Sequence, residues 1–237
     1  LETHGGDAKL IAGGQSLVPM MAMRLARPAL LVDIHRLTDL QSITRSVDSV
    51  CTGAGVRQAQ MENHEVIGKD LPLVQQALRW VGHQQTRNRG TVGGSLAYAD
   101  PSAELPLAAM VLGAQIHIQS ARDMRAVSAV DFFLGPMFTE VGDTECITRI
   151  DWPVWSGARV GCAFEETAIR HGDFAMASAA CQIQLDAHGR ITRLRLGAGG
   201  VAGTPLVFTP LTDALTGQTL TPEAAKDLAQ AAARLCD

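Results

Sequence analysis

The chain has 237 residues, of which 46% are hydrophobic, a formal net charge of −4, and five cysteines that stand singly. This length is enough to bury a core, and we predict two domains. Acidic and basic residues are interspersed, which argues against nucleic acid as a partner, and no stretch reaches the ~18 apolar residues of a membrane span. The scattered cysteines match neither zinc nor iron–sulfur spacing, so we expect no metal centre on this chain.

The N-terminal residues have the pattern of a βαβ unit. A short apolar run at residues 9–12 predicts a strand that ends at a pair of glycines. Ser16 is placed to cap a helix that runs through Arg24, and residues 29–34 have the composition of a buried strand.

The next hundred residues predict strands and helices in alternation. Alternating polarity at 41–56 indicates strands with a tight turn at 53–55, and residues 63–82 have helical spacing with Pro72 near the start of the longer helix. Residues 84–101 are rich in Gly, Asn and Arg and predict a loop. A helix at 103–112 and a strand at 114–119 follow.

A segment punctuated by Pro153 and Gly157 predicts a connector between two domains. The elements expected beyond it are a strand at 162–169, a turn at 171–173, a helix or strand at 176–185, a strand at 191–196 and a helix after Pro222.

Residues 12–17, AGGQSL, form the first candidate site. This glycine pair lies between a predicted strand and a predicted helix, where free backbone N–H groups and a helix N-terminus would converge on a phosphate. The alternative is a tight turn in which Ser16 serves only as the N-cap of the helix.

Residues 90–95, GTVGGS, form a second glycine loop with a hydroxyl on each side. Two loops of this kind, each lined with backbone amides, would hold a diphosphate from two sides without any lysine. Neither loop is a P-loop or a Rossmann G-x-G-x-x-G motif. The pattern therefore indicates a cofactor that contains a diphosphate and is held by a fold other than the P-loop or Rossmann fold.

The stretches AGGQSLVPMMAMRLARPALLVDI and TRNRGTVGGSLAYADPSAELP resemble the two FAD-binding loops of the medium, flavoprotein subunit of aerobic carbon monoxide dehydrogenase and its relatives in the xanthine dehydrogenase family. The motifs DFFLGP, RIDWP, FEETAIRHGDFA and LGAGGVAGTP are similar to further landmarks of this family, so the resemblance covers nearly the whole chain. Family members begin earlier and continue past Asp237, and we therefore expect both ends to be cut.

The resemblance implies an α+β fold. Residues 1–157 would form an FAD-binding domain of the vanillyl-alcohol oxidase (PCMH) type, with two α/β subdomains at about 1–50 and 51–157 and FAD between them. Residues 158–237 would form a domain like the carbon monoxide dehydrogenase flavoprotein C-terminal domain, with an antiparallel sheet and a helix.

The same resemblance assigns cofactor contacts to residues of both loops and of five further segments. These residues are Ala12, Gly13, Gly14, Gln15, Ser16, Leu17, Gly53, Ala54, Val81, Gly90, Thr91, Gly93, Gly94, Ser95, Asp100, Glu104, Ile147 and Phe174. The two glycine loops would cradle the pyrophosphate, Asp100 and Glu104 would hydrogen-bond the cofactor, and Ile147 would contact the ring. The two acidic residues are also placed to cap the helix after Pro101, a role compatible with the first.

The chain departs from the family pattern in two places. Tyr98 stands where many relatives have a histidine, which puts a flavin contact by that imidazole in doubt. Glu165 and Glu166 stand where some relatives have a lysine near the ring. Loss of a cation beside a flavin is expected to lower its reduction potential.

No nucleophile, base or paired carboxylate motif is visible, so we predict no catalytic residue on this chain. The resemblance implies an FAD-binding electron-transfer subunit of a heterotrimeric molybdenum hydroxylase. Electrons would come from [2Fe–2S] clusters on a small subunit, and a large subunit would carry the molybdopterin cofactor and determine the substrate. A dimer of such heterotrimers is expected in the cytoplasm, free or attached to the cytoplasmic side of the membrane.

Residues 165–176 would pass beside the flavin ring, and we hypothesise that this loop controls access of the electron acceptor. Two alternatives remain open from the residues alone. One is a self-contained FAD-dependent reductase or oxidase of the same fold. The other is a non-catalytic module in which the glycine loops are only turns.

Overall fold

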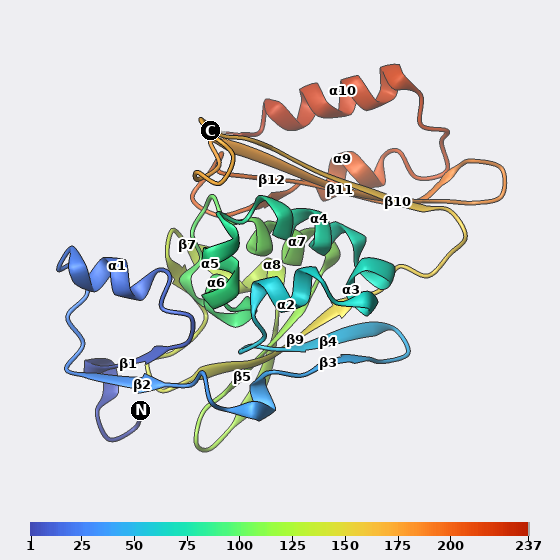
Figure 1. The fold of residues 1–237 in the computed structure, drawn as a ribbon. Coiled ribbons are helices and arrows are strands. Elements are labelled where there is room, and N and C mark those ends of the chain that lie inside the picture. The colour runs from blue at the N-terminus through green and yellow to red at the C-terminus, as the bar shows by residue number, and fades with distance from the viewer. Residues whose placement is uncertain (237) are drawn as a thin grey trace.

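The computed structural model describes residues 1–236. Helices form a layer between a five-stranded sheet and a four-stranded sheet, and the second sheet carries two further helices (Figure 1). A small unit from the N-terminal residues lies to one side of these layers. None of the helices described combines the length and apolar composition needed to cross a bilayer.

The N-terminal residues form the predicted βαβ unit. Strands β1 (Ala8–Ile11) and β2 (Leu30–Asp33) pair in parallel, and helix α1 (Leu17–Ala22) connects them. The helix ends earlier than predicted, because Arg24 adopts a left-handed φ of 61°. The prediction of a buried strand at 29–34 is wrong, since no residue of β2 is buried. A two-stranded sheet has too few neighbours to cover its faces.

The five-stranded sheet is antiparallel, in the order β3-β4-β9-β5-β6. Its strands are β3 (Ile43–Arg45), β4 (Ser49–Gly53), β5 (Gln115–Gln119), β6 (Met124–Ser128) and β9 (Cys146–Pro153). The turn predicted at 53–55 follows β4 instead of separating two strands, and β3 and β4 are joined at 46–48. Trp152 of β9 is fully buried and donates from Nε1 to Thr52 Oγ1 at 2.9 Å.

Seven helices pack above this sheet. They are α2 (Gln58–Glu62), α3 (Glu65–Asp70), α4 (Pro72–Trp80), α5 (Gln84–Arg89), α6 (Val92–Tyr98), α7 (Glu104–Leu112) and α8 (Ala129–Phe132). Pro72 takes the first position of α4, as its sequence predicts. Every residue of α7 is buried, because this helix contacts both sheets. A hairpin of β7 (Phe133–Gly135) and β8 (Phe138–Thr139) follows α8.

The prediction of a loop at 84–101 is wrong, because helices α5 and α6 occupy most of this segment. Thr91 caps α6 by accepting a hydrogen bond from Gly94 N at 3.1 Å. Gly93 packs against Ala54, where a Cβ on residue 93 would come within 2.9 Å of Ala54 O. Tertiary contact of this kind outweighs the low helix propensity of glycine.

The second sheet is antiparallel, in the order β10-β11-β12-β13. Its strands are β10 (Val160–Thr167), β11 (Ala177–Leu185), β12 (Ile191–Gly199) and β13 (Leu206–Val207). The segment 176–185, left open between helix and strand, is thus a strand. Helices α9 (Thr209–Asp213) and α10 (Pro222–Ala233) complete the chain, and α10 is the helix predicted after Pro222.

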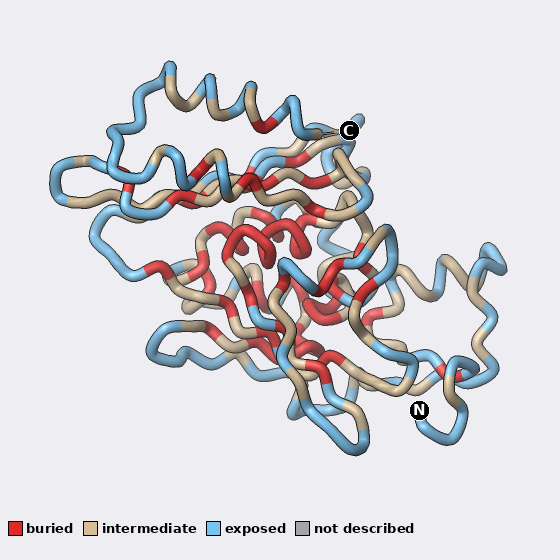
Figure 2. The backbone as a smooth tube through the Cα atoms, turned by 180° about the vertical axis from the view of Figure 1, so that it is seen from behind, coloured by how far each residue is buried: buried red, intermediate tan, exposed pale blue. Residues whose placement is uncertain are grey.

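One hydrophobic core joins the two sheets through the helices (Figure 2). Phe164 and Ala180 of the second sheet belong to the same buried cluster as Leu107 of α7 and Trp152 of the first sheet. Residues near α7 are therefore packed between the five-stranded sheet and the four-stranded sheet.

Candidate functional site

The first glycine loop, residues 12–16, joins β1 to α1. Gly14 has a φ of +72°, which glycine adopts without strain. Gly13 has no space for a side chain, because an added Cβ would overlap the carbonyl oxygen of Arg89 and lie 2.8 Å from Gly90 Cα. The backbone conformation at Gly14 and the close packing at Gly13 therefore explain why glycine stands at both positions.

Backbone N–H groups of this loop lack internal acceptors. Among residues 1–236, no acceptor for the amides of residues 13 to 17 is found. Ser16 occupies the N-cap position of α1, as predicted, but its side chain makes no capping hydrogen bond. Consecutive free amides at the start of a helix are suited to an anion.

The second glycine loop, residues 90–95, uses its amides within the protein. Gly93 N donates to Ala54 O at 2.8 Å, and Gly94 N donates to Thr91 Oγ1 at 3.1 Å. The prediction that both loops are lined with free amides is therefore wrong for this one. Its glycines serve close packing instead, since a Cβ at Gly93 would overlap the Ala54 side chain.

Three segments far apart in the sequence meet at this point. The first loop contacts the second, because a Cβ at Gly94 would lie 4.0 Å from the Cβ of Ala12. The predicted third loop, Gly53 and Ala54, packs beneath Gly93. The structure thus brings all three predicted loops together, although residues 13, 54 and 93 are well separated in the chain.

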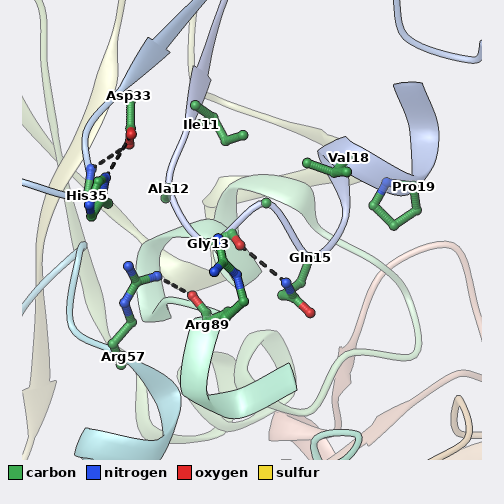
Figure 3. A pocket seen from close by; sticks show the side chains of 11 residues that line it. Ile11, Ala12, Gly13, Gln15, Val18, Pro19, Asp33, His35, Arg57 and Arg89 are labelled. Atoms are coloured by element: carbon green, nitrogen blue, oxygen red, sulfur yellow. Dashed lines mark hydrogen bonds and ion pairs between the residues drawn. The ribbon is translucent and has the colours of Figure 1, made fainter. Parts of the chain in front are cut away.

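A pocket of about 550 Å³ opens beside the first loop (Figure 3). Two arginines line it, Arg57 and Arg89, and the guanidinium of Arg57 donates to the carbonyl oxygen of Arg89. Burial, and secondarily the charge of Arg89, lowers the pKa of Arg57. Neither guanidinium has a carboxylate partner among residues 1–236. Arginines without an ion-pair partner favour an anionic ligand.

The carboxylate in the same pocket is already engaged. Asp33, at the end of β2, accepts from the backbone N–H of His35 at 2.9 Å and contacts its ring Nδ1 at 2.7 Å. The backbone hydrogen bond from His35 is the largest cause of the lowered pKa of Asp33. Asp33 therefore makes no ion pair with either arginine, and its charge is the smallest of the three influences on the pKa of Arg57.

Sequence reasoning missed the four charged or titratable residues of this pocket. Arg89 directly precedes Gly90 of the second glycine loop, and this position in the sequence could have identified it as a site residue. Arg57 follows the third loop closely, yet its place beside Arg89 depends on folding.

Two family models match the chain. Residues 1–155 match the FAD binding domain in molybdopterin dehydrogenase, and residues 162–237 match the CO dehydrogenase flavoprotein C-terminal domain. The chain belongs to the FAD-binding medium subunits of the molybdenum hydroxylases. It is accordingly an oxidoreductase subunit, and the resemblance stated from the sequence is confirmed.

Relatives with names and structures agree with this family. The chain is 40% identical to the 6-hydroxypseudooxynicotine dehydrogenase complex subunit alpha of Paenarthrobacter nicotinovorans, over 85% of this chain and 69% of that protein. It is 38% identical to the nicotine 6-hydroxylase medium subunit of the same organism, over 96% of this chain and 79% of that protein. Carbon monoxide dehydrogenase from Hydrogenophaga pseudoflava matches with a TM-score of 0.95 and 33% identity, over 100% of this chain and 82% of that one. The predicted fold class is therefore confirmed.

The acidic residues of this family member follow α6. Asp100 Oδ1 accepts from Ser102 N at 2.9 Å, and α7 begins only at Glu104, so the prediction that Asp100 caps this helix is wrong. Glu104 is 8% exposed. Burial, with a smaller contribution from nearby Glu166, raises the pKa of Glu104 to about 8. This carboxyl is therefore protonated at neutral pH.

The remaining predicted residues fall into two places. Ile147 is buried on β9 beside Thr148, whose carbonyl accepts from Ala54 N at 3.0 Å, so it lies with the three loops. Val81 is buried at the end of α4, whereas Phe174 is 78% exposed.

The loop that carries Phe174 packs against the segments around Val81 and Asp100. Ser102 Oγ donates to Ala175 O at 2.9 Å, and a Cβ at Gly172 would lie 2.7 Å from His83 Nδ1. Val81, Asp100, Glu104 and Phe174 therefore belong to one region, which we call the α7 end of the site.

Proposed function

We propose that this chain is the FAD-binding electron-transfer subunit of a heterotrimeric molybdenum hydroxylase. It takes electrons from [2Fe–2S] clusters on a small partner subunit and passes them through FAD to an external acceptor. A large partner subunit holds the molybdopterin cofactor and the substrate. The observation that carries this proposal is the row of free amides at residues 13–17 beside two arginines that have no ion-pair partner among residues 1–236.

These residues fit the diphosphate of FAD. A diphosphate offers two negative charges and many acceptor oxygens, which match several N–H donors and a positive field. The amides of the first loop provide the donors, and Arg57 and Arg89 provide the field. Gly93 and Gly94 position this loop by letting the second and third loops pack closely behind it.

The flavin ring would lie at the α7 end. Val81 provides an apolar wall, and the neutral carboxyl of Glu104 can donate a hydrogen bond to a ring carbonyl. When bound, FAD supplies the redox chemistry, because it accepts electrons singly and releases them in pairs. Phe174 is exposed on the loop 165–176, which supports the proposal that this loop controls access of the acceptor.

We further propose a dimer of heterotrimers in the cytoplasm. The relatives, named as a medium subunit and as a subunit of a dehydrogenase complex, support a complex of several subunits. The dimer and its location rest on the family resemblance alone. Both relatives also act on nicotine-related compounds by name, which makes N-heterocycles the first substrates to screen with the complete complex.

The test is the cofactor content of the natively purified complex, together with FAD titration of the isolated full chain. We expect flavin, iron and molybdenum in the complex, and one FAD per chain with quenched flavin fluorescence. A complex with flavin but without iron and molybdenum would overturn the heterotrimer in favour of a self-contained reductase. A chain that binds no FAD would overturn the proposal entirely.

A further inference from the structure

The N-terminal βαβ unit, residues 1–34, has almost no core of its own. No residue of α1 or β2 is buried, and Ala8 is the one buried residue of β1. The apolar side chains of Val18, Met23 and Leu25 are exposed. A two-stranded sheet and a six-residue helix are too small to be stable by themselves in water. The unit therefore depends on the rest of the chain for its stability.

Few interactions attach this unit to the residues that follow. Within residues 1–236, no backbone hydrogen bond joins the unit to a later helix or strand. Two ion pairs reach from the unit to distant residues, Lys9 with Asp143 at 3.5 Å and Glu2 with Arg122 at 3.3 Å. All four of these side chains are at least 45% exposed, so the two pairs contribute little to stability.

The first glycine loop makes a further contact across the same boundary. Gly13 packs against the backbone of Arg89 and Gly90, and a Cβ at Gly94 would lie 4.0 Å from the Cβ of Ala12. The surfaces that meet here are backbone and a single methyl group, which bury little apolar area. The unit is thus joined to the rest of the chain by a narrow contact.

The pocket beside the first loop lies across this boundary. The free amides of residues 13–17 belong to the unit, whereas Arg57 and Arg89 belong to the segments of α2 and α5 (Figure 3). A diphosphate in the pocket therefore contacts both sides at once. Because it binds only the docked unit, such a ligand stabilises the docked state by mass action.

We propose that residues 1–34 form a lid that the diphosphate of FAD clamps against Arg57 and Arg89. This inference rests on the proposed function, in which FAD occupies this pocket. Strands β1 and β2 and helix α1 open together, because none of them is stable alone. When FAD is bound, the lid opens only if the diphosphate loses its contacts on one side. Release of the cofactor therefore requires the lid to unfold.

The first test is hydrogen–deuterium exchange of the full chain at residues 20–32, none of which lines the pocket. With FAD at about a hundred times its dissociation constant, exchange there should slow about a hundredfold, in step with β1. Helix α10, which lies beyond the second sheet (Figure 1), should show no change. Slower exchange confined to residues 13–17 would overturn the proposal. A chain that binds no FAD would refute the proposed function instead.

The second test uses two exposed alanines in different helices, Ala22 on α1 and Ala229 on α10. Glycine destabilises a helix relative to alanine. In the flavin-free chain, Ala22→Gly should speed exchange about two- to fivefold in β1 and β2 as well as in α1. It should speed the dissociation of FAD by the same factor, whereas Ala229→Gly should leave both rates as in wild type. Faster exchange in α1 alone, or unaltered release of FAD from Ala22→Gly, would overturn the proposal.

Discussion

The backbone of Gly13 lies directly against the carbonyl oxygen of Arg89, with no space between them for a methyl group. This contact joins the loop after β1 to the segment that begins the second glycine loop. Because Arg57 donates to the same carbonyl group, the contact also fixes the two arginines relative to the free amides. The geometry of the pocket therefore depends on a residue without a side chain.

Replacing Gly13 with alanine should separate these segments. We expect Gly13→Ala to lower the free energy of unfolding by about 1–3 kcal/mol, as for other overpacked sites, and to weaken FAD binding. Urea denaturation and FAD titration measure the two effects. Gly161→Ala is the control, since a Cβ there would meet nothing closer than 3.8 Å. Equal behaviour of the two variants would refute the close contact.

Removing the charge of Arg57 should weaken cofactor binding without unfolding the chain. We expect Arg57→Ala to raise the dissociation constant for FAD about tenfold, which corresponds to about 1.4 kcal/mol. Binding by wild type should weaken with added salt more than binding by the variant. Arg79→Ala, on the exposed side of α4, should match wild type. An unchanged dissociation constant for FAD in Arg57→Ala would show that Arg57 does not contribute to cofactor binding.

Stability of the flavin-free chain should fall as the pH rises. The pKa values of Glu104 and Glu166 are raised in the folded state to about 8 and about 7. The two protonated carboxyls therefore contribute their full stabilisation below the ordinary carboxyl pKa. This stabilisation is lost as the pH rises from there through the raised pKa values. We expect a loss of about 2–4 kcal/mol between about pH 5 and pH 9 in urea denaturation. Glu104→Gln and Glu166→Gln should each show a flatter dependence, and slopes equal to wild type would contradict the assignment.

Removing the ring of Phe174 should affect the acceptor step alone. Because Phe174 is 78% exposed, Phe174→Ala should change the free energy of unfolding by less than about 0.5 kcal/mol. In the complete complex, we expect slower reoxidation of the flavin and an unchanged rate of flavin reduction by substrate in stopped-flow measurements. Ile169→Ala, which is 81% exposed in the same loop, provides the comparison. Unaltered reoxidation in Phe174→Ala would refute control of access by this loop.

Local sequence patterns were sufficient for several parts of this fold. The glycine pair between β1 and α1 follows from an apolar run, a break and a helical pattern, all within a few residues. Helix α7 follows from its continuous apolar composition. The family resemblance then placed both glycine loops in one site, which local patterns alone do not do.

Other features depend on contacts between distant residues. Helix α6 contains Gly93 and Gly94, and it forms because Gly93 fits against Ala54. The apolar composition of β2 predicts burial, but its two-stranded sheet leaves it at the surface. The pocket arginines come from segments thirty-two residues apart, so their proximity could not be inferred from spacing.

The central claim is that the free amides of residues 13–17 hold the FAD diphosphate. Hydrogen–deuterium exchange of the full chain, with and without FAD, tests it most directly. We predict strong protection of a peptide covering residues 13–17, and little change at Gly93 and Gly94, whose amides are already bonded within the protein. ADP should protect the same peptide, because it carries the same diphosphate. FAD binding without protection of residues 13–17 would contradict the claim.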